Sequence, residues 1–182
     1  KLIAHESADT SLQTRTLRAG SNATRYKNKK VAIVGNGAIG SYVADLLFRS
    51  GVGRLTLIDP EKLRPGNIIR HVASNQYMGW PKPMAVKATL AERGLSVSDI
   101  HVSDDRITTA QQAIMLFAEH DLVIDATADL RATSILEYAA NELDDTPLVE
   151  VWLQRNGDIA RVDRFPLWDG EHHLPIIPPG ED

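Results

Sequence analysis

The sequence contains no cysteine among its 182 residues. This absence excludes disulfide bonds, zinc sites built on thiolates and catalysis by a cysteine nucleophile. Disulfides are typical of secreted proteins and rare in the reducing cytosol. We therefore expect a cytoplasmic protein.

A strong excess of charge and long hydrophobic runs are also missing. Lys and Arg number 20 against 24 Asp and Glu, which gives a formal net charge of −4. This balance offers no general attraction for nucleic acid, and no apolar run approaches the roughly 20 residues that a membrane-spanning helix needs. We expect neither nucleic acid nor a membrane among the partners. The chain opens at Lys1 without a signal-peptide pattern, and we expect it to be part of a longer protein.

What the sequence does contain is an alternation of short apolar runs and helical patterns. Three such runs predict buried parallel strands at Val31–Val34, Leu55–Ile58 and Leu122–Ile124. Apolar residues at helical spacing predict helices at Ile39–Ser50, Met84–Arg93, Ala110–Glu119 and Leu130–Asn141. Strands that alternate with helices predict an α/β fold with a doubly wound, mostly parallel sheet.

The pattern changes toward the C-terminal end. The segments Leu148–Leu153 and Ile159–Phe165 flank an Asn-Gly pair, and they predict a hairpin that adds antiparallel strands to the sheet. Four of the nine prolines follow this hairpin, which predicts an extended loop or tail. We therefore divide the chain into a polar, partly helical N-terminal segment (1–30), a central α/β domain (31–165) and a Pro-rich loop or tail (166–182).

A glycine-rich segment follows the first predicted strand and opens the next helix. It consists of Gly35, Asn36, Gly37, Ala38, Ile39 and Gly40. Glycines at this spacing permit a tight turn, and the helix N-terminus presents free N–H groups to phosphates. Asp59 ends the second strand, 22 residues after Gly37, where a carboxylate can accept hydrogen bonds from ribose hydroxyls. The pattern predicts a site for an adenosine nucleotide without separating NAD from ATP; the alternative is that the glycines serve only the turn and Asp59 only caps the strand.

The residues from Asp59 onward resemble one family. Segment 59–71, DPEKLRPGNIIRH, is similar to D-x-D-x-V-x-x-x-N-L-x-R-Q of the ThiF/MoeB/HesA family, which includes relatives of the ubiquitin-activating E1 enzymes. Segment 79–82, GWPK, matches the family's G-x-x-K, and segment 121–127, DLVIDAT, matches its D-L-V-x-D-x-T. The resemblance extends from about Thr14 to Phe165.

The resemblance implies a Rossmann-like fold and ATP-dependent adenylation of the C-terminal carboxylate of a ubiquitin-like or sulfur-carrier protein, performed by a homodimer. It implies that Arg70 and Lys82 contact the triphosphate, that Asn67 hydrogen-bonds it and that Asp59 holds the ribose. Arg15, on an N-terminal helix, would reach the ATP of the partner subunit. Without the resemblance, Arg70 reads as a surface arginine, Lys82 as a solvated loop lysine and Asn67 as the N-cap of a short helical turn.

Two departures from the family pattern bear on catalysis. The family's D-x-T-D-N stretch has a second Asp that supports Mg²⁺, whereas this chain has Ala128 at that position. We expect Asp125 or Asp129 to support Mg²⁺ and the adenylation step instead. The chain also lacks the cysteine that some members use to pass on the activated carboxylate. A catalytically weak E1-like subunit that binds partners is therefore one alternative function, and a NAD-dependent oxidoreductase, which gives Arg70 and Lys82 no role, is another.

Overall fold

A computed structural model of the chain describes residues 9, 11, 14, 23–93, 96–143, 145–154 and 157–166. The elements in chain order are α2 (Ala23–Tyr26), β1 (Lys30–Val34), α3 (Ala38–Arg49), β2 (Arg54–Ile58), η1 (Pro65–Arg70), η2 (Asn75–Tyr77), α4 (Lys82–Glu92), β3 (Ile100–Ser103), α5 (Ala110–Glu119), β4 (Leu122–Asp125), α6 (Leu130–Glu142), β5 (Leu148–Gln154) and β6 (Ile159–Phe165). The predictions for Arg15, for most of segment 1–30 and for the tail after Pro166 lie outside the described residues.

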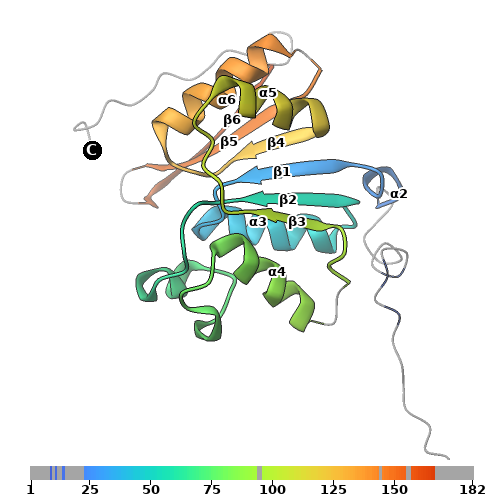
Figure 1. Cartoon of the computed structure of the whole chain (residues 1–182), viewed down its shortest axis with the longest axis vertical. Helices are drawn as coiled ribbons and strands as arrows, with labels where there is room; N and C mark the ends of the chain where they lie inside the picture. The colour runs from blue at the N-terminus through green and yellow to red at the C-terminus, as the bar shows by residue number, and fades with distance from the viewer. Residues whose placement is uncertain are drawn as a thin grey trace, which may run out of the picture.

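The strands form one six-stranded sheet in the order β3-β2-β1-β4-β5-β6 (Figure 1). All neighbours pair in parallel except β5 and β6, which are antiparallel. The predicted fold class is therefore confirmed, including the antiparallel strands at the C-terminal end. Because β1 lies between β2 and β4, the chain winds first to one side of β1 and then to the other. Ligands of doubly wound sheets bind in the crevice that this reversal opens at the carboxyl ends of the strands.

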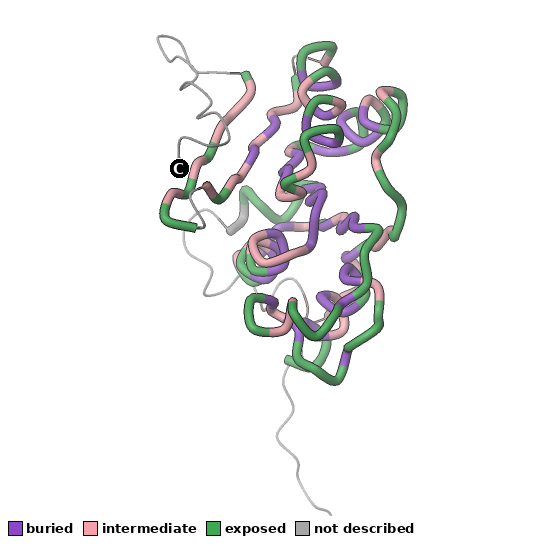
Figure 2. The backbone as a smooth tube through the Cα atoms, turned by 90° about the vertical axis from the view of Figure 1, so that its left-hand side faces the viewer, coloured by how far each residue is buried: buried purple, intermediate pink, exposed green. Residues whose placement is uncertain are grey.

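The sheet separates two hydrophobic clusters. Val31 and Ile33 of β1 pack with α3 and α4 on one face, whereas Ala32 and Val34 pack with α5 and α6 on the other. Successive side chains of a strand point to opposite faces, so a strand covered on both faces reads as a continuous apolar run. Figure 2 shows this burial in the strands, whereas many of the connecting loops are exposed.

The structure differs from the prediction at two elements. β3 was not predicted, because its sequence alternates Ile100 and Val102 with the polar His101 and Ser103 and gives no apolar run. Helix α4 begins at Lys82, two residues before the predicted start at Met84. This earlier start matters, because it puts Lys82 on a helix end instead of in a loop.

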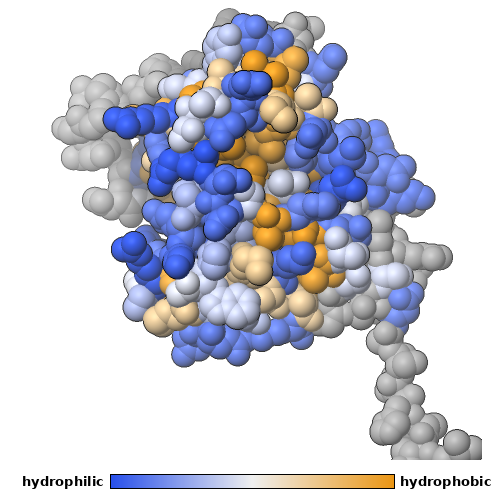
Figure 3. All heavy atoms as spheres, viewed as in Figure 1, coloured by the Kyte–Doolittle hydropathy of each residue, from blue (hydrophilic) through white to orange (hydrophobic). Residues whose placement is uncertain are grey.

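The surface is mixed in character. Figure 3 shows hydrophobic side chains reaching the surface in separate patches near the middle of this face, among many hydrophilic ones. No described helix combines the length and the apolar character needed to cross a membrane.

Candidate functional site

A cavity of about 580 Å³ opens at the carboxyl ends of β1, β2 and β4. It is lined by Val34, Gly35, Gly37, Ile58, Asp59, Pro60, Glu61, Lys82, Asp105, Arg106, Ile107 and residues 126–132. The cavity thus lies where the chain reverses its winding direction, which is the expected ligand crevice of such a sheet. Of the predicted site residues, the structure brings Gly35, Gly37, Asp59, Lys82 and Asp129 together in this lining.

The glycine loop requires glycine at two positions for steric reasons. Gly35 has φ +87°, and a Cβ on it would lie 2.6 Å from the backbone of Ala126. A Cβ on Gly40 would lie 1.9 Å from the carbonyl oxygen of Gly35. Gly37, the residue before α3, is different: a Cβ there meets nothing within 4 Å, and the residue lines the cavity. The tight turn therefore requires glycine at positions 35 and 40. At Gly37 the requirement is different, because the space beside its Cα is open to a ligand.

Helix α3 begins immediately after Gly37, which lines the cavity. The first N–H groups of a helix have no acceptor within the helix and carry partial positive charge. Ala38, Ile39 and Gly40 are the first three residues of α3. Their backbone is therefore suited to an anion, as the sequence predicted for these positions.

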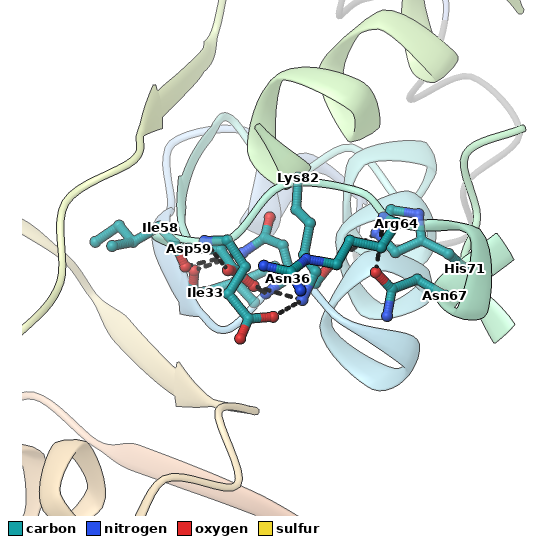
Figure 4. A network of polar contacts seen from close by, with 9 residues as sticks. Ile33, Asn36, Ile58, Asp59, Arg64, Asn67, His71 and Lys82 are labelled. Carbon is teal, nitrogen blue, oxygen red and sulfur yellow. Dashed lines mark hydrogen bonds and ion pairs between the residues drawn. The ribbon is translucent and has the colours of Figure 1, made fainter. Parts of the chain in front are cut away.

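Asp59 connects the glycine loop to the end of β2. Its Oδ2 accepts a hydrogen bond from the N–H of Asn36 at 2.7 Å, and its Oδ1 accepts one from the N–H of Glu61 at 2.8 Å. The side-chain amide of Asn36 donates to the carbonyls of Ile33 and Ile58, both at 3.2 Å (Figure 4). Asp59 is thus a structural anchor, and each of its carboxylate oxygens retains a further lone pair for a ligand.

Lys82 is a buried cation in the cavity wall, only 6% exposed. Its Nζ lies 2.5 Å from Oε2 of Glu61 and 3.8 Å from Oδ2 of Asp59. The ammonium group holds the pKa of Glu61 below its ordinary value, chiefly through this hydrogen bond. A buried lysine needs such carboxylate partners, so the interpretation of Lys82 as a solvated loop lysine is wrong.

His71 fixes the glycine loop from the opposite side to Asp59. Its Nδ1 accepts a hydrogen bond from the N–H of Ala73 at 3.0 Å, so the ring proton resides on Nε2, which donates to the carbonyl of Asn36 at 2.8 Å. Burial lowers the pKa of His71, and the nearby Lys82 ammonium acts in the same direction. The neutral His71 side chain thus holds the carbonyl of Asn36 in the glycine loop in place, and Figure 4 shows both residues.

Two predicted phosphate ligands lie outside the cavity lining. Asn67 is the third residue of η1, and its Oδ1 accepts a hydrogen bond at 2.9 Å from the N–H of Arg64, which is the N-cap residue. The alternative that Asn67 is itself the N-cap is therefore wrong. Arg70 is exposed at the end of η1. Their contacts with a triphosphate stay predictions.

The two predicted magnesium ligands differ in their surroundings. Both carboxylate oxygens of Asp125 are occupied, because Oδ1 accepts from the N–H and hydroxyl of Thr127 and Oδ2 accepts from the hydroxyl of Thr133. Asp129 caps α6 by accepting from the N–H of Arg131 at 3.0 Å, and its Oδ2 lies 3.2 Å from Nη1 of Arg106.

Ala128 stands between them in the left-handed conformation, with φ +53°. Asp tolerates this conformation better than Ala does. Among the described residues no group of three or more His, Asp or Glu side chains could hold a metal ion. Asp125 is hydrogen-bonded to threonines and Asp129 is paired with Arg106, so the described residues present no cluster of unpaired carboxylates for Mg²⁺. Support of Mg²⁺ by Asp125 or Asp129 stays a prediction.

Two residues of the cavity were missed by sequence reasoning. Glu61 occupies the second acidic position of the D-x-D pattern. The pattern therefore marked this residue, although no role was predicted for it. Arg106 belongs to no motif and follows β3, the strand that the sequence did not reveal.

Comparison with known proteins agrees with this geometry. The ThiF family model matches residues 11–164. Over 149 residues the chain is 30% identical to the ATP-dependent ubiquitin transferase-like protein Cap2 of Pseudomonas aeruginosa, covering 77% of this chain and 25% of Cap2. It is also 30% identical over 170 residues to ubiquitin-like modifier-activating enzyme 5 of Bombyx mori, covering 88% of this chain and 40% of that enzyme.

The fold is also similar to that of solved structures. The Escherichia coli tRNA N6-threonylcarbamoyladenosine dehydratase TcdA, in complex with ATP, superimposes with a TM-score of 0.61 at 26% identity, covering 76% of this chain and 57% of TcdA. The chain therefore spans well under two thirds of these relatives' lengths. Because the family model covers most of the chain and the sheet order and glycine loop agree with it, the chain belongs to the ThiF family.

Proposed function

We propose that the cavity binds ATP and that the protein adenylates a carboxylate. The observation that carries this proposal is Lys82, a buried ammonium in the wall of the cavity, 3.8 Å from Asp59 and on the same side as the glycine loop. A cation in this position suits a polyphosphate that becomes a leaving group, because it stabilises charge where charge develops. The solved complexes of TcdA with ATP and with AMP support the choice of nucleotide.

The reaction needs no covalent intermediate on the protein. A carboxylate oxygen of the acceptor attacks the α-phosphorus, the bond to the bridging oxygen breaks, and pyrophosphate leaves with the electron pair. The protein's part is to position the groups and to stabilise the charge. The first N–H groups of α3 would bind a phosphate, the free lone pairs of Asp59 would accept from the ribose, and Lys82 would exchange part of its contact with Glu61 for a phosphate oxygen.

The acceptor that we propose is the C-terminal carboxylate of a ubiquitin-like or sulfur-carrier protein. The names of two relatives, a ubiquitin transferase-like protein and a ubiquitin-like modifier-activating enzyme, support this choice. Exchange of labelled pyrophosphate into ATP tests it directly. We expect exchange that depends on a carrier with a free terminal carboxylate and that ceases when this carboxylate is amidated. Exchange that persists with the amidated carrier would contradict the proposed acceptor.

We also propose a homodimer, supported by an apolar surface on one side of the sheet. Val149 packs toward the cluster under α3, so by strand alternation Leu153 points to the same side, as does Val162 on β6. Leu153 and Val162 are exposed, and so are Tyr42 and Leu46 on α3. Sedimentation velocity should show a dimer that dissociates on the double change Leu153→Asp and Val162→Asp. Met115→Asp, an exposed residue of α5 across the sheet, should leave it intact; a monomer at all concentrations would contradict the proposal.

Ala128 supports a second candidate function, a subunit that binds a nucleotide or a partner without efficient adenylation. The exchange assay separates the two candidates when it is combined with a binding measurement. ATP binding without exchange, for any carrier and also after Ala128→Asp, would favour the binding subunit. Exchange that increases after Ala128→Asp would favour an adenylating site with a weakened catalytic residue.

A further inference from the structure

Arg106 stands at the rim of the cavity between two carboxylates. Its Nη1 lies 3.2 Å from Oδ2 of Asp129, and its positive charge contributes to lowering the pKa of Glu61. It also lines an adjoining cavity of about 670 Å³, which shares Pro60 and Glu61 with the first. Arg106 thus reaches the cavity from the β3–α5 connection, whereas Lys82 lies on α4.

The pair between Arg106 and Asp129 is exposed enough to be exchanged easily. The side chains of Arg106 and Asp129 are 56% and 38% exposed, and ion pairs in such surroundings contribute at most about 1 kcal/mol. Asp129 has a separate structural contact, because its Oδ1 accepts from the N–H of Arg131 at the start of α6. The guanidinium can therefore leave Asp129 without loss of the helix cap.

The carboxylates near this rim are poorly arranged for a metal. Both oxygens of Asp125 accept hydrogen bonds from threonines, Ala128 has no ligand atom, and Asp129 pairs with the guanidinium of Arg106. A guanidinium, by contrast, presents a planar fork of N–H donors that fits phosphate oxygens in a bidentate manner. The guanidinium of Arg106 at this rim is thus suited to bind a phosphate.

We propose that Arg106 binds the phosphates of the nucleotide, and that Asp129 holds its guanidinium at the rim until they arrive. In this role Arg106 supplies positive charge at the end of the cavity where the family pattern has an acidic residue for Mg²⁺. The proposal rests on the proposed function only in its use of ATP as the ligand.

Titration calorimetry with ATP, with Mg²⁺ and with a chelator in its place, tests this role. Arg106→Ala should weaken ATP binding about tenfold in both conditions, because a charge-assisted contact is lost. Its affinity for adenosine should not change. Arg54→Ala is the matched control, since it removes an exposed arginine at the opposite end of β2 and should leave ATP binding unchanged.

Asp129→Asn distinguishes phosphate binding from a purely structural pair. Asn keeps an oxygen to cap α6 but releases Arg106, so ATP affinity should stay equal or rise a few-fold. Equal weakening by Asp129→Asn and Arg106→Ala would overturn the proposal, because Arg106 would then act only through Asp129. Weakening by Asp129→Asn in Mg²⁺ alone would identify a metal ligand and overturn it as well.

Three further outcomes are decisive. If Arg106→Ala weakens adenosine as much as ATP, Arg106 contacts the base and the proposal fails. If the unchanged protein binds ATP and Arg106→Ala binds it equally well, this proposal fails while the proposed function stands. If the unchanged protein binds no ATP, the proposed function fails. Thermal unfolding followed by circular dichroism should show that all variants are folded.

Discussion

Asp59 combines an observed structural role with a predicted contact to ribose, and a sequence motif cannot separate the two. Both of its oxygens already accept backbone hydrogen bonds, from Asn36 and Glu61, in a nearly buried position. The predicted contact with ribose therefore uses a carboxylate that also holds the glycine loop in place. The sequence left open whether Asp59 binds a ligand or only caps the strand. The structure shows the structural role, and the contact with ribose stays a prediction.

Asp59→Ala should reduce both stability and nucleotide binding. The buried N–H of Asn36 and the partly buried N–H of Glu61 lose their acceptor, and we expect the free energy of unfolding to fall by about 2 kcal/mol. ATP affinity should fall by a further 1.5 to 3 kcal/mol, roughly, because a charge-assisted hydrogen bond to the ribose is lost. Urea unfolding and calorimetry measure the two effects. Unchanged ATP affinity in the folded variant would show that Asp59 is structural only.

Glu150 on β5 is a buried carboxyl group with a strongly raised pKa. Burial, assisted by the charges of Glu137, Asp125 and Asp163, raises the pKa of Glu150 to about 8. Its strand neighbours in register are Asp125 and Asp163, and its Oε1 has no hydrogen-bond partner among the described residues. The side chain is thus protonated in the folded protein at neutral pH.

A raised pKa in the folded state makes stability depend on pH with a definite sign. Below the ordinary pKa of 4.5 both states are protonated, and the contribution of Glu150 is fully present; it is lost as the pH rises toward 8. Glu150→Gln should abolish this loss and increase the free energy of unfolding at pH 8 by about 2 to 4 kcal/mol. Urea unfolding at pH 5 and pH 8 measures it, with the exposed Glu142→Gln as control. If the free energy of unfolding varied with pH in the same way in the wild type and in Glu150→Gln, the raised pKa of Glu150 would be contradicted.

At the scale of elements, the glycine loop and α3 give a matched set of variants. Gly40→Ala places a Cβ 1.9 Å from a backbone oxygen, so we expect destabilisation by about 3 kcal/mol. Gly37→Ala meets nothing within 4 Å, and its stability should change by less than about 0.5 kcal/mol.

The second member of the set tests ligand binding without loss of the fold. Because Gly37 lines the cavity, its added methyl group should reduce ATP affinity about tenfold by standing where a phosphate approaches. Gly66→Ala on η1 also meets nothing within 4 Å but lies outside the cavity lining, and it should bind ATP normally. Equal ATP binding by Gly37→Ala and Gly66→Ala would show that phosphates do not approach this loop.

The elements that the sequence could reveal are those buried on both faces. β1 and β4 read as apolar runs because helices cover both sides of the sheet there. β3 is an edge strand with an exposed His101, and its alternation over four residues was too short to distinguish from a loop. Arg106 was missed for a related reason, since its position depends on where β3 ends.

The site residues that could be predicted from the sequence are those that lie close to the end of a strand. Gly35 and Asp59 directly follow β1 and β2, and Gly37 lies two residues after Gly35. The parallel pairing of Val34 with Ile58 therefore brings them together at the carboxyl ends of the strands. Arg70 and Asn67 lie on η1, a short 3-10 helix whose direction the sequence pattern does not determine. The hydrogen bond to Oδ2 of Asp125 comes from Thr133, eight residues along the chain on α6, and no local pattern indicates this contact.

At the scale of the whole molecule, the account depends on which nucleotide the cavity accepts. The doubly wound sheet and the glycine loop suit NAD as well as ATP, because both ligands carry adenosine and phosphates. What distinguishes them is the positive charge of Lys82 and Arg106, which suits the terminal phosphates of ATP. Positive charge in this cavity therefore decides between the two nucleotides.

Calorimetric titration of the protein with ATP and, separately, with NAD tests this claim most directly. The account predicts that ATP binds at least tenfold more tightly than NAD, and that Lys82→Met removes most of this preference. NAD binding equal to or stronger than that of ATP would contradict the account.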